Sequence, residues 1–151
     1  MTVVRRILCL ANSKKMSGRC VAGREVLDSG PGAWIRPVSA RPTEEVSEDE
    51  RQYRNGSDPR LLDVIDVPLI RAAPHACQTE NWLLDPDYYW SRVRQVGWAE
   101  LQHYVEDPAT LWTNDRSTYN GANDEILQAD ADRCRPGTGA PPRRLPLSVG
   151  R

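Results

Sequence analysis

The chain has 151 residues, of which 39% are hydrophobic and 27% are charged, and this fits one ordinary globular domain. Collagen-like, fibrous and membrane-spanning classes are excluded, because no window approaches about 18 uninterrupted apolar residues. The formal net charge of −1 argues against a protein that coats nucleic acid indiscriminately, since such binding depends on neutralising many phosphates. The apolar start contains Arg5 and Arg6 and lacks a signal-peptide pattern, so we expect a cytoplasmic protein without membrane association.

The charge is distributed unevenly along the chain. Residues 1–41 contain eight Lys or Arg and two acidic residues, residues 42–132 contain seven and nineteen, and residues 133–151 contain five Arg and no acidic residue. The first segment can therefore form a local basic face that attracts phosphate groups. Because 18 of the 20 basic residues are Arg, a coding sequence rich in G and C with simply solvated acidic segments explains the pattern equally well, and both interpretations stay open.

The first third of the chain predicts three short strands joined by turns. Residues 3–11 are apolar and β-branched and run into a polar turn cluster at residues 12–15. Residues 19–27 mix polar and apolar side chains without a helical period and give the second strand. Residues 28–32 read Asp-Ser-Gly-Pro-Gly and predict a reversal. Residues 33–38 then alternate as a further strand, in which Pro37 indicates an edge position.

The middle of the chain predicts a short helix and two more strands. Residues 47–50 have the Ser-x-x-Glu form of a capping box, so we expect a helix from there to about Tyr53. Residues 61–70 and 78–84 predict the fourth and fifth strands, and Pro68 indicates an edge or a bulge.

Two further segments follow. Apolar side chains in residues 88–106 recur every three or four positions, interrupted at Gly97, which predicts an amphipathic helical segment. The last nineteen residues contain four Pro, three Gly and five Arg, so we expect a disordered tail over residues 132–151.

The reactive side chains match no known catalytic or metal-binding pattern. His75 and His103 are the only histidines, and neither has a partner at metal-ligand spacing. Asp63 and Asp66 are three apart on a strand, so their side chains face opposite sides and should be solvated or turn-capping acids rather than a catalytic pair. The cysteines form no Cys-x-x-Cys pair, and we expect buried free thiols at positions 9, 20, 77 and 134.

No Gly-x-Ser-x-Gly elbow and no phosphate-binding loop of the Gly-x-x-x-x-Gly-Lys form is present in the sequence. We therefore expect no enzymatic activity, no metal and no cofactor. A nuclease or other hydrolase with an unrecognised site stays open as a third alternative.

The aromatic content is unusual, with five Trp, five Tyr and no Phe. Trp34 and Arg36 lie two apart on a predicted strand and therefore share one face, a combination suited to base stacking and phosphate attraction. The alternative is a core Trp34 with Arg36 extended beside it, and the two interpretations carry equal weight. We expect Trp90, Trp98 and Trp112 to be core anchors.

Six stretches of the sequence, taken in order, resemble the dual OB-containing domain family, prokaryotic proteins named for two consecutive OB-type barrels and associated with conflict and defence systems. The resemblance covers about residues 3–127. The stretches are residues 8–14, 18–23, 34–39, 61–64 with 68–69, 78–82, and 111–112 followed by 121–124.

This resemblance implies a mainly β (α+β) fold, an OB-like small β-barrel with a helical segment around residues 88–106. Residues 3–127 would form the OB-like domain, the first part of a dual-OB unit. The family pattern continues with further strands where this chain has its Arg, Pro and Gly tail, so a truncated or frame-shifted product is expected.

The implied function is a non-catalytic module that binds single-stranded nucleic acid or a nucleotide-like ligand. The alternative is a protein-interaction or scaffold module, with a protein partner encoded in a defence operon. For ligand binding we expect Lys14, Arg19 and Arg36 to face phosphates, Trp34 and Trp82 to stack, and Asn12 and Asn81 to read hydrogen-bonding groups.

Overall fold

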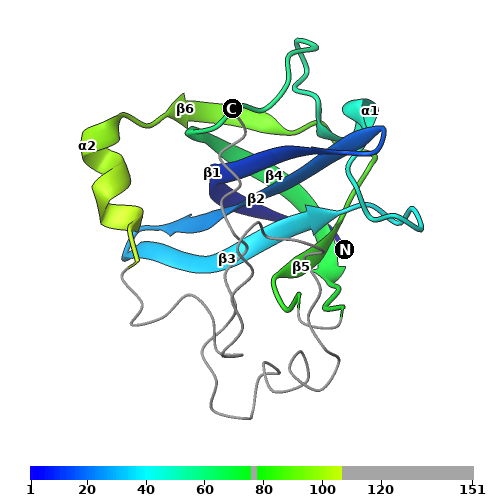
Figure 1. Ribbon diagram of the computed structural model, residues 1–151, viewed down its shortest axis with the longest axis horizontal. Helices are drawn as coiled ribbons and strands as arrows, with labels where there is room; N and C mark the ends of the chain where they lie inside the picture. The colour runs from blue at the N-terminus through cyan, green and yellow to red at the C-terminus, as the bar shows by residue number, and fades with distance from the viewer. Residues whose placement is uncertain (76–77, 107–151) are drawn as a thin grey trace, which may run out of the picture.

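The computed structural model describes residues 1–75 and 78–106, and five of its strands close into a ring (Figure 1). The order around the ring is β1-β2-β3-β5-β4, and β4 pairs back with β1. Within the ring β3 and β5 are parallel, and the other neighbours are antiparallel. The strands are β1 (Val3–Lys15), β2 (Gly18–Leu27), β3 (Gly30–Val38), β4 (Asp63–Ala72), β5 (Asn81–Leu84) and, outside the ring, β6 (Ser91–Gln95). The mainly β, OB-like barrel expected from the sequence is confirmed.

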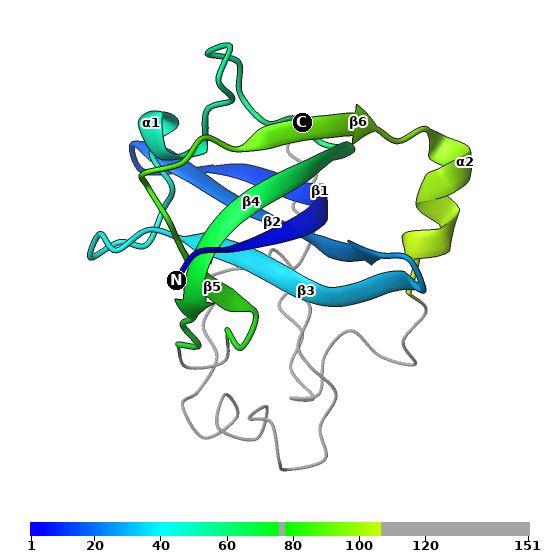
Figure 2. The ribbon, with the colours of Figure 1, turned by 180° about the vertical axis from the view of Figure 1, so that it is seen from behind.

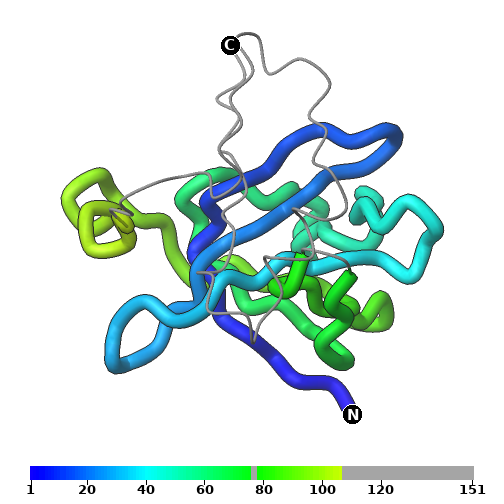
Figure 3. Tube along the Cα trace, turned by 60° about the horizontal axis from the view of Figure 1, so that its bottom comes forward, coloured from blue at the N-terminus to red at the C-terminus, as the bar shows by residue number. Residues whose placement is uncertain are grey.

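The first hairpin is longer than the sequence predicts. Residues 12–15 were expected to form a turn cluster, but they belong to β1 and pair with the start of β2 up to Lys15, which lies opposite Gly18. The turn is confined to residues 16–17, and Met16 has a left-handed φ of 49°. Strand pairing outweighs the turn preference of the polar residues here, because both strands continue past the barrel as a two-stranded arm (Figure 3).

The reversal between β2 and β3 is confirmed, with Gly30 at φ 116°, a value that favours glycine. The edge position predicted for Pro37 applies only to the end of β3, not to the whole strand. β3 lies between β2 and β5, but its pairing with β2 ends at Ile35, opposite Gly23. Arg36 N donates to Glu80 O over 2.9 Å on the β5 side, so the nitrogen of Pro37 faces the side that is no longer paired.

The interior of the ring holds the main apolar core, to which residues next to the short helix α1 (Glu48–Arg51) contribute. The capping box is confirmed, because Ser47 Oγ accepts from Glu50 N while the Glu50 carboxylate accepts from Ser47 N over 2.8 Å. Val46 and Tyr53 flank this helix and are buried. The buried core residues are Ile7, Cys9, Val21, Ile35, Val46, Tyr53, Ile65, Val67, Leu69, Leu84 and Trp90.

A second apolar cluster lies on the outer side of the barrel, where α2 (Trp98–Leu101) and η1 (Gln102–Tyr104) cover it (Figure 2). Leu8 on β1 and Val64 on β4 are buried in this cluster, and Leu101 and Tyr104 pack against it. Residues 98–104 thus supply the helical segment expected within residues 88–106.

The prediction of a helix is wrong for the first half of residues 88–106. Residues 91–95 form β6, which pairs antiparallel with β4, and Gly97 separates it from the helix as the N-cap of α2. The free edge of β4 offers backbone hydrogen bonds that outweigh a helical side-chain period over so few residues. Trp90 is buried in the core as expected, whereas Trp98 is 78% exposed and is no core anchor.

Several predictions fall on residues outside the described ranges. These are the domain end at 127, the disordered tail over 132–151, the thiols of Cys77 and Cys134, and Trp112. Among the described residues, no helix has the length and apolar character needed to cross a membrane.

Candidate ligand-binding face

Arg24 on β2 and Trp34 on β3 lie opposite each other on the outer face of the barrel. The neighbouring Ile35 is buried in the core, so strand alternation places Trp34 on the outer side. Leu8 of the outer cluster lies opposite Arg24 on the other flank and confirms this orientation. The three side chains form one row across β1, β2 and β3.

The Arg24 guanidinium is held close to the Trp34 ring. Its carbon lies 6.0 Å from the ring centroid, and Nε donates to Gly32 O over 2.7 Å. Trp34 is partly buried, and its Nε1 has no hydrogen-bond partner in the described part of the chain. Nη1 of Arg24 pairs with Glu106, which follows η1. An aromatic ring and a guanidinium are thereby fixed side by side on β2 and β3.

Arg36 shares the outer face with Trp34, as predicted, but it does not reach out to phosphates. It is only 4% exposed, and Nη1 donates to Asn81 Oδ1 over 3.1 Å while Nη2 lies 3.9 Å from Cys20 Sγ. Asn81 is fully buried and donates to Gln78 Oε1, so it is no reader of ligand groups in this conformation. The parallel register of β3 and β5 sets Arg36 opposite Asn81, a pairing that no local sequence pattern indicates.

The first hairpin carries the remaining predicted polar residues, on the other side from Cys20. Asn12 lies opposite the core residue Val21, so it points inward at the end of the barrel, where Nδ2 donates to Pro59 O over 2.8 Å. Lys14 and Arg19 lie opposite each other two positions further out and therefore share that side. Lys14 is exposed and Arg19 is partly exposed. Asn12 thus anchors a loop, while the two cations stay accessible near the hairpin tip.

Trp82 is separated from Trp34 as well. It follows Asn81 on β5, so its side chain faces the other side of the sheet and packs against the main core. The Arg5 guanidinium lies 5.0 Å from its ring centroid, and Arg5 Nη1 donates to Glu25 Oε1 over 2.8 Å. The seven predicted site residues therefore fall into three places rather than one.

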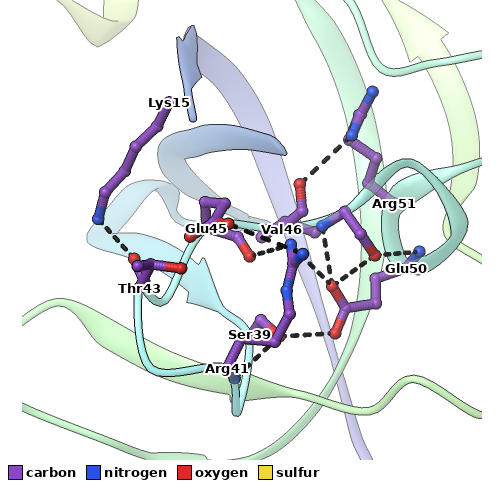
Figure 4. Close-up of polar contacts among 9 residues, drawn as sticks. Lys15, Ser39, Arg41, Thr43, Glu45, Val46, Glu50 and Arg51 are labelled. Carbon is purple, nitrogen blue, oxygen red and sulfur yellow. Dashed lines mark hydrogen bonds and ion pairs between the residues drawn. The ribbon is translucent and has the colours of Figure 1, made fainter. Parts of the chain in front are cut away.

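The segment between β3 and α1 ties the loops at one end of the barrel together (Figure 4). Lys15 Nζ of the first hairpin donates to Thr43 O over 2.6 Å. On the other flank, His75 Nδ1 of the β4–β5 loop lies 2.9 Å from Glu44 Oε1. This contact gives His75 a structural role between the two loops.

A carboxylate-centred network holds the same segment in shape. Burial acts to raise the pKa of Glu50, but hydrogen bonds from the Ser47 backbone, the Ser47 hydroxyl and the Ser39 hydroxyl hold it below its usual value. Arg41 Nη2 donates to Glu45 O over 2.6 Å in the same network.

The two aspartates of β4 face opposite sides, as predicted. Asp66 lies on the outside and accepts from Arg6 Nε over 2.7 Å. Asp63 is fully buried rather than solvated, but it does cap a turn as the other alternative predicts, because its Oδ2 accepts from Arg60 N over 3.0 Å. The same carboxylate also accepts from Tyr53 Oη over 2.9 Å. Burial is the main cause that raises the pKa of Tyr53, and the hydrogen bond to Asp63 is the second. Burial also raises the pKa of Cys9 to about 12.

Arg24 is the site residue that sequence reasoning missed. A two-residue turn at positions 28–29 would pair Arg24 with Ala33, but an irregularity between Arg24 and Val26 shifts the register so that Arg24 meets Trp34. A shift of one residue exchanges the faces of all later side chains, and nothing in the sequence marks it.

The comparisons with known proteins give one family. The model of the family described as the dual OB-containing domain matches residues 5–138. No curated protein and no solved structure matches the chain.

Proposed function

The chain belongs to the dual OB-containing domain family, and on that premise we propose that it is a non-catalytic cytoplasmic module that binds single-stranded nucleic acid or a nucleotide-like ligand. OB barrels bind such ligands across strands 2 and 3 and the adjoining loops. The corresponding surface here is the outer face of β2 and β3. We place this binding within a prokaryotic defence system as part of the same proposal.

The observation that carries the proposal is the pairing of Arg24 with Trp34. A partly exposed indole supplies a stacking surface for a base, and stacking contributes about 1 to 3 kcal/mol per base. A guanidinium beside it supplies charge and directed N–H donors for a phosphate. Lys14 and Arg19 at the hairpin tip add to the field that attracts a polyanion. Arg36 and Asn81 hold β3 against β5 and so keep the face in shape.

The test is a fluorescence-anisotropy titration of labelled single-stranded DNA and RNA of roughly 12 nucleotides, a length that one OB barrel can cover. We expect Trp34→Ala and Arg24→Ala each to weaken binding by about 10-fold or more, which corresponds to about 1.4 kcal/mol. Trp98→Ala and Arg71→Ala are the matched controls, because Trp98 is 78% exposed on α2 and Arg71 is exposed on β4. Equal affinity of all four variants and the parent protein would refute the proposal.

A protein-interaction module is the second candidate, and one observation favours it. Large apolar side chains are exposed along the segment that contains β6 and α2, with Trp98 at 78%, Val105 at 69% and Tyr88 at 57%. Salt separates the two functions, because phosphate contacts make the affinity fall steeply with ionic strength while an apolar interface is much less sensitive.

A further inference from the structure

The acidic residue next to the candidate face comes from a distant part of the chain. Glu106 lies two residues after the segment α2–η1, and its carboxylate pairs with Arg24 Nη1. Both side chains are largely covered, with 12% of Arg24 and 28% of Glu106 exposed. The pair is thus part of the packed surface and differs from the open ion pair of Arg94 with Glu100 nearby, where 45% and 38% are exposed.

The fold fixes Glu106 at this position. Leu101 and Tyr104 pack on the outer cluster, which includes Leu8, and Leu8 lies directly opposite Arg24 in the β1–β2 pairing. The segment is therefore anchored one strand away from the guanidinium that it meets. Because Arg24 Nε is bound to Gly32 O, the guanidinium cannot turn away and presents its remaining N–H groups to the Glu106 side.

A carboxylate and a phosphate bind to the same N–H groups of an arginine side chain. Both are anions with two oxygens that can accept the two parallel N–H groups of the guanidinium, so arginine binds both in the same way. A carboxylate on the guanidinium that lies beside the indole thus occupies the place where the phosphate of a stacked nucleotide would bind. This reasoning rests on the function proposed above, since it assigns part of the same face.

We propose that Arg24 forms a phosphate-binding site whose resident intramolecular occupant is the Glu106 carboxylate, and that a ligand phosphate displaces this carboxylate when it binds. Ligand binding is then coupled to release of the Glu106 carboxylate from Arg24, and the free energy of the Arg24–Glu106 pair lowers the observed affinity. Removing the charge of Glu106 strengthens binding, which is the reverse of the weakening expected when a residue that contacts the ligand is lost.

The experiment compares Glu106→Gln with Glu100→Gln. Both substitutions remove one negative charge from the same short segment, but Glu100 pairs with Arg94, away from the β2–β3 face. In anisotropy titrations with a single-stranded thymidine oligonucleotide, we expect Glu106→Gln to bind about 5-fold to 10-fold more tightly than the parent chain, and Glu100→Gln to change the affinity less than 2-fold. An equal gain in both variants would show a general charge effect and overturn the proposal.

A double-mutant cycle isolates the pair from any other effect of Glu106. In an Arg24→Gln background, the gain from Glu106→Gln should disappear. If the full gain persists there, Glu106 acts elsewhere and the proposal fails.

A second measurement separates this proposal from the proposed function. The Arg24 Nε–H resonance is followed by NMR while inorganic pyrophosphate is added to the parent chain and to Glu106→Gln. A response that occurs at lower pyrophosphate concentration in Glu106→Gln supports the site even if no oligonucleotide binds to any variant, an outcome that would refute only the nucleic-acid function. An unchanged resonance in both proteins overturns the phosphate site itself.

Discussion

Arg36 on β3 and Asn81 on β5 face each other across the parallel strand pair of the barrel, and Arg36 Nη1 donates to Asn81 Oδ1 over 3.1 Å. Asn81 is fully buried and Arg36 is 4% exposed. A buried guanidinium needs hydrogen-bond acceptors, because leaving it without them costs the desolvation energy of a charge. This contact therefore stabilises the closure of the ring, in place of the phosphate contact predicted for Arg36 and the ligand-reading role predicted for Asn81.

Asn81→Ala should accordingly destabilise the fold by about 2 to 3 kcal/mol, the range for a hydrogen bond to a charged group whose partner stays buried. Urea denaturation followed by circular dichroism measures the change. Gln95→Ala, an exposed position on the edge strand β6, is the control and should change the free energy of unfolding by less than about 0.5 kcal/mol. Similar values for the two variants would remove the structural role assigned to Asn81.

The alkaline pH dependence of stability should reflect the buried thiol of Cys9. Burial raises its pKa from 9.0 to about 12, so the folded protein keeps a proton that the unfolded chain releases. The stabilisation is complete below about pH 9 and is lost as the pH rises toward 12, with a slope of up to about 1.4 kcal/mol per pH unit from this group. Cys9→Ala should flatten the fall in the free energy of unfolding between pH 9 and 10. An unchanged slope in the variant would contradict this assignment.

Tyr53 adds a second alkaline component above its usual pKa of 10.0, because burial and the hydrogen bond to Asp63 raise the pKa of its hydroxyl. The sign is the same as for Cys9, since the folded state again holds the proton more firmly. Tyr53→Phe should therefore leave the slope below pH 10 unchanged and reduce it above pH 10. Urea titrations at several pH values measure both slopes, and a change confined to the lower range would refute the assignment.

The sequence predicts those parts of the fold that depend on neighbouring residues. The capping box at Ser47 is a local pattern and is confirmed, as are the reversal before β3 and most of the five ring strands. The site depends on contacts between distant residues. Arg24 meets Trp34 through a register shift, Arg36 meets Asn81 through a parallel pairing, and Glu106 reaches Arg24 from another part of the chain. Tertiary pairing also overrides the helical period of residues 91–95, which form β6.

Ser47→Ala should lower the free energy of unfolding by about 1 kcal/mol at pH 7, because the hydroxyl caps α1 and also donates to Glu50. These hydrogen bonds hold the pKa of Glu50 below its usual 4.5, although burial acts in the opposite direction. A lowered carboxyl pKa stabilises the fold above the usual value, and the contribution is lost as the pH falls through the folded value. The difference between the parent and Ser47→Ala should therefore shrink in acid. A difference that stays constant from pH 7 to pH 3 would show that the carboxylate takes no part.

Two glycines should respond in opposite ways to an added side chain. A Cβ on Gly23 would lie 2.1 Å from Leu8 O, and the backbone of β1 cannot yield without breaking the hairpin register at its bulge. Gly23→Ala should therefore cost more than about 3 kcal/mol, in the range of strongly destabilising substitutions.

Gly97 has open space around its Cβ position and extended dihedral angles, φ −90° and ψ 171°, but supplies no side-chain cap to α2. Gly97→Ser adds that cap and should stabilise the protein by a few tenths of a kcal/mol. Thermal unfolding of both variants tests the pair of predictions, and a destabilised Gly97→Ser would show that α2 does not begin in the geometry described.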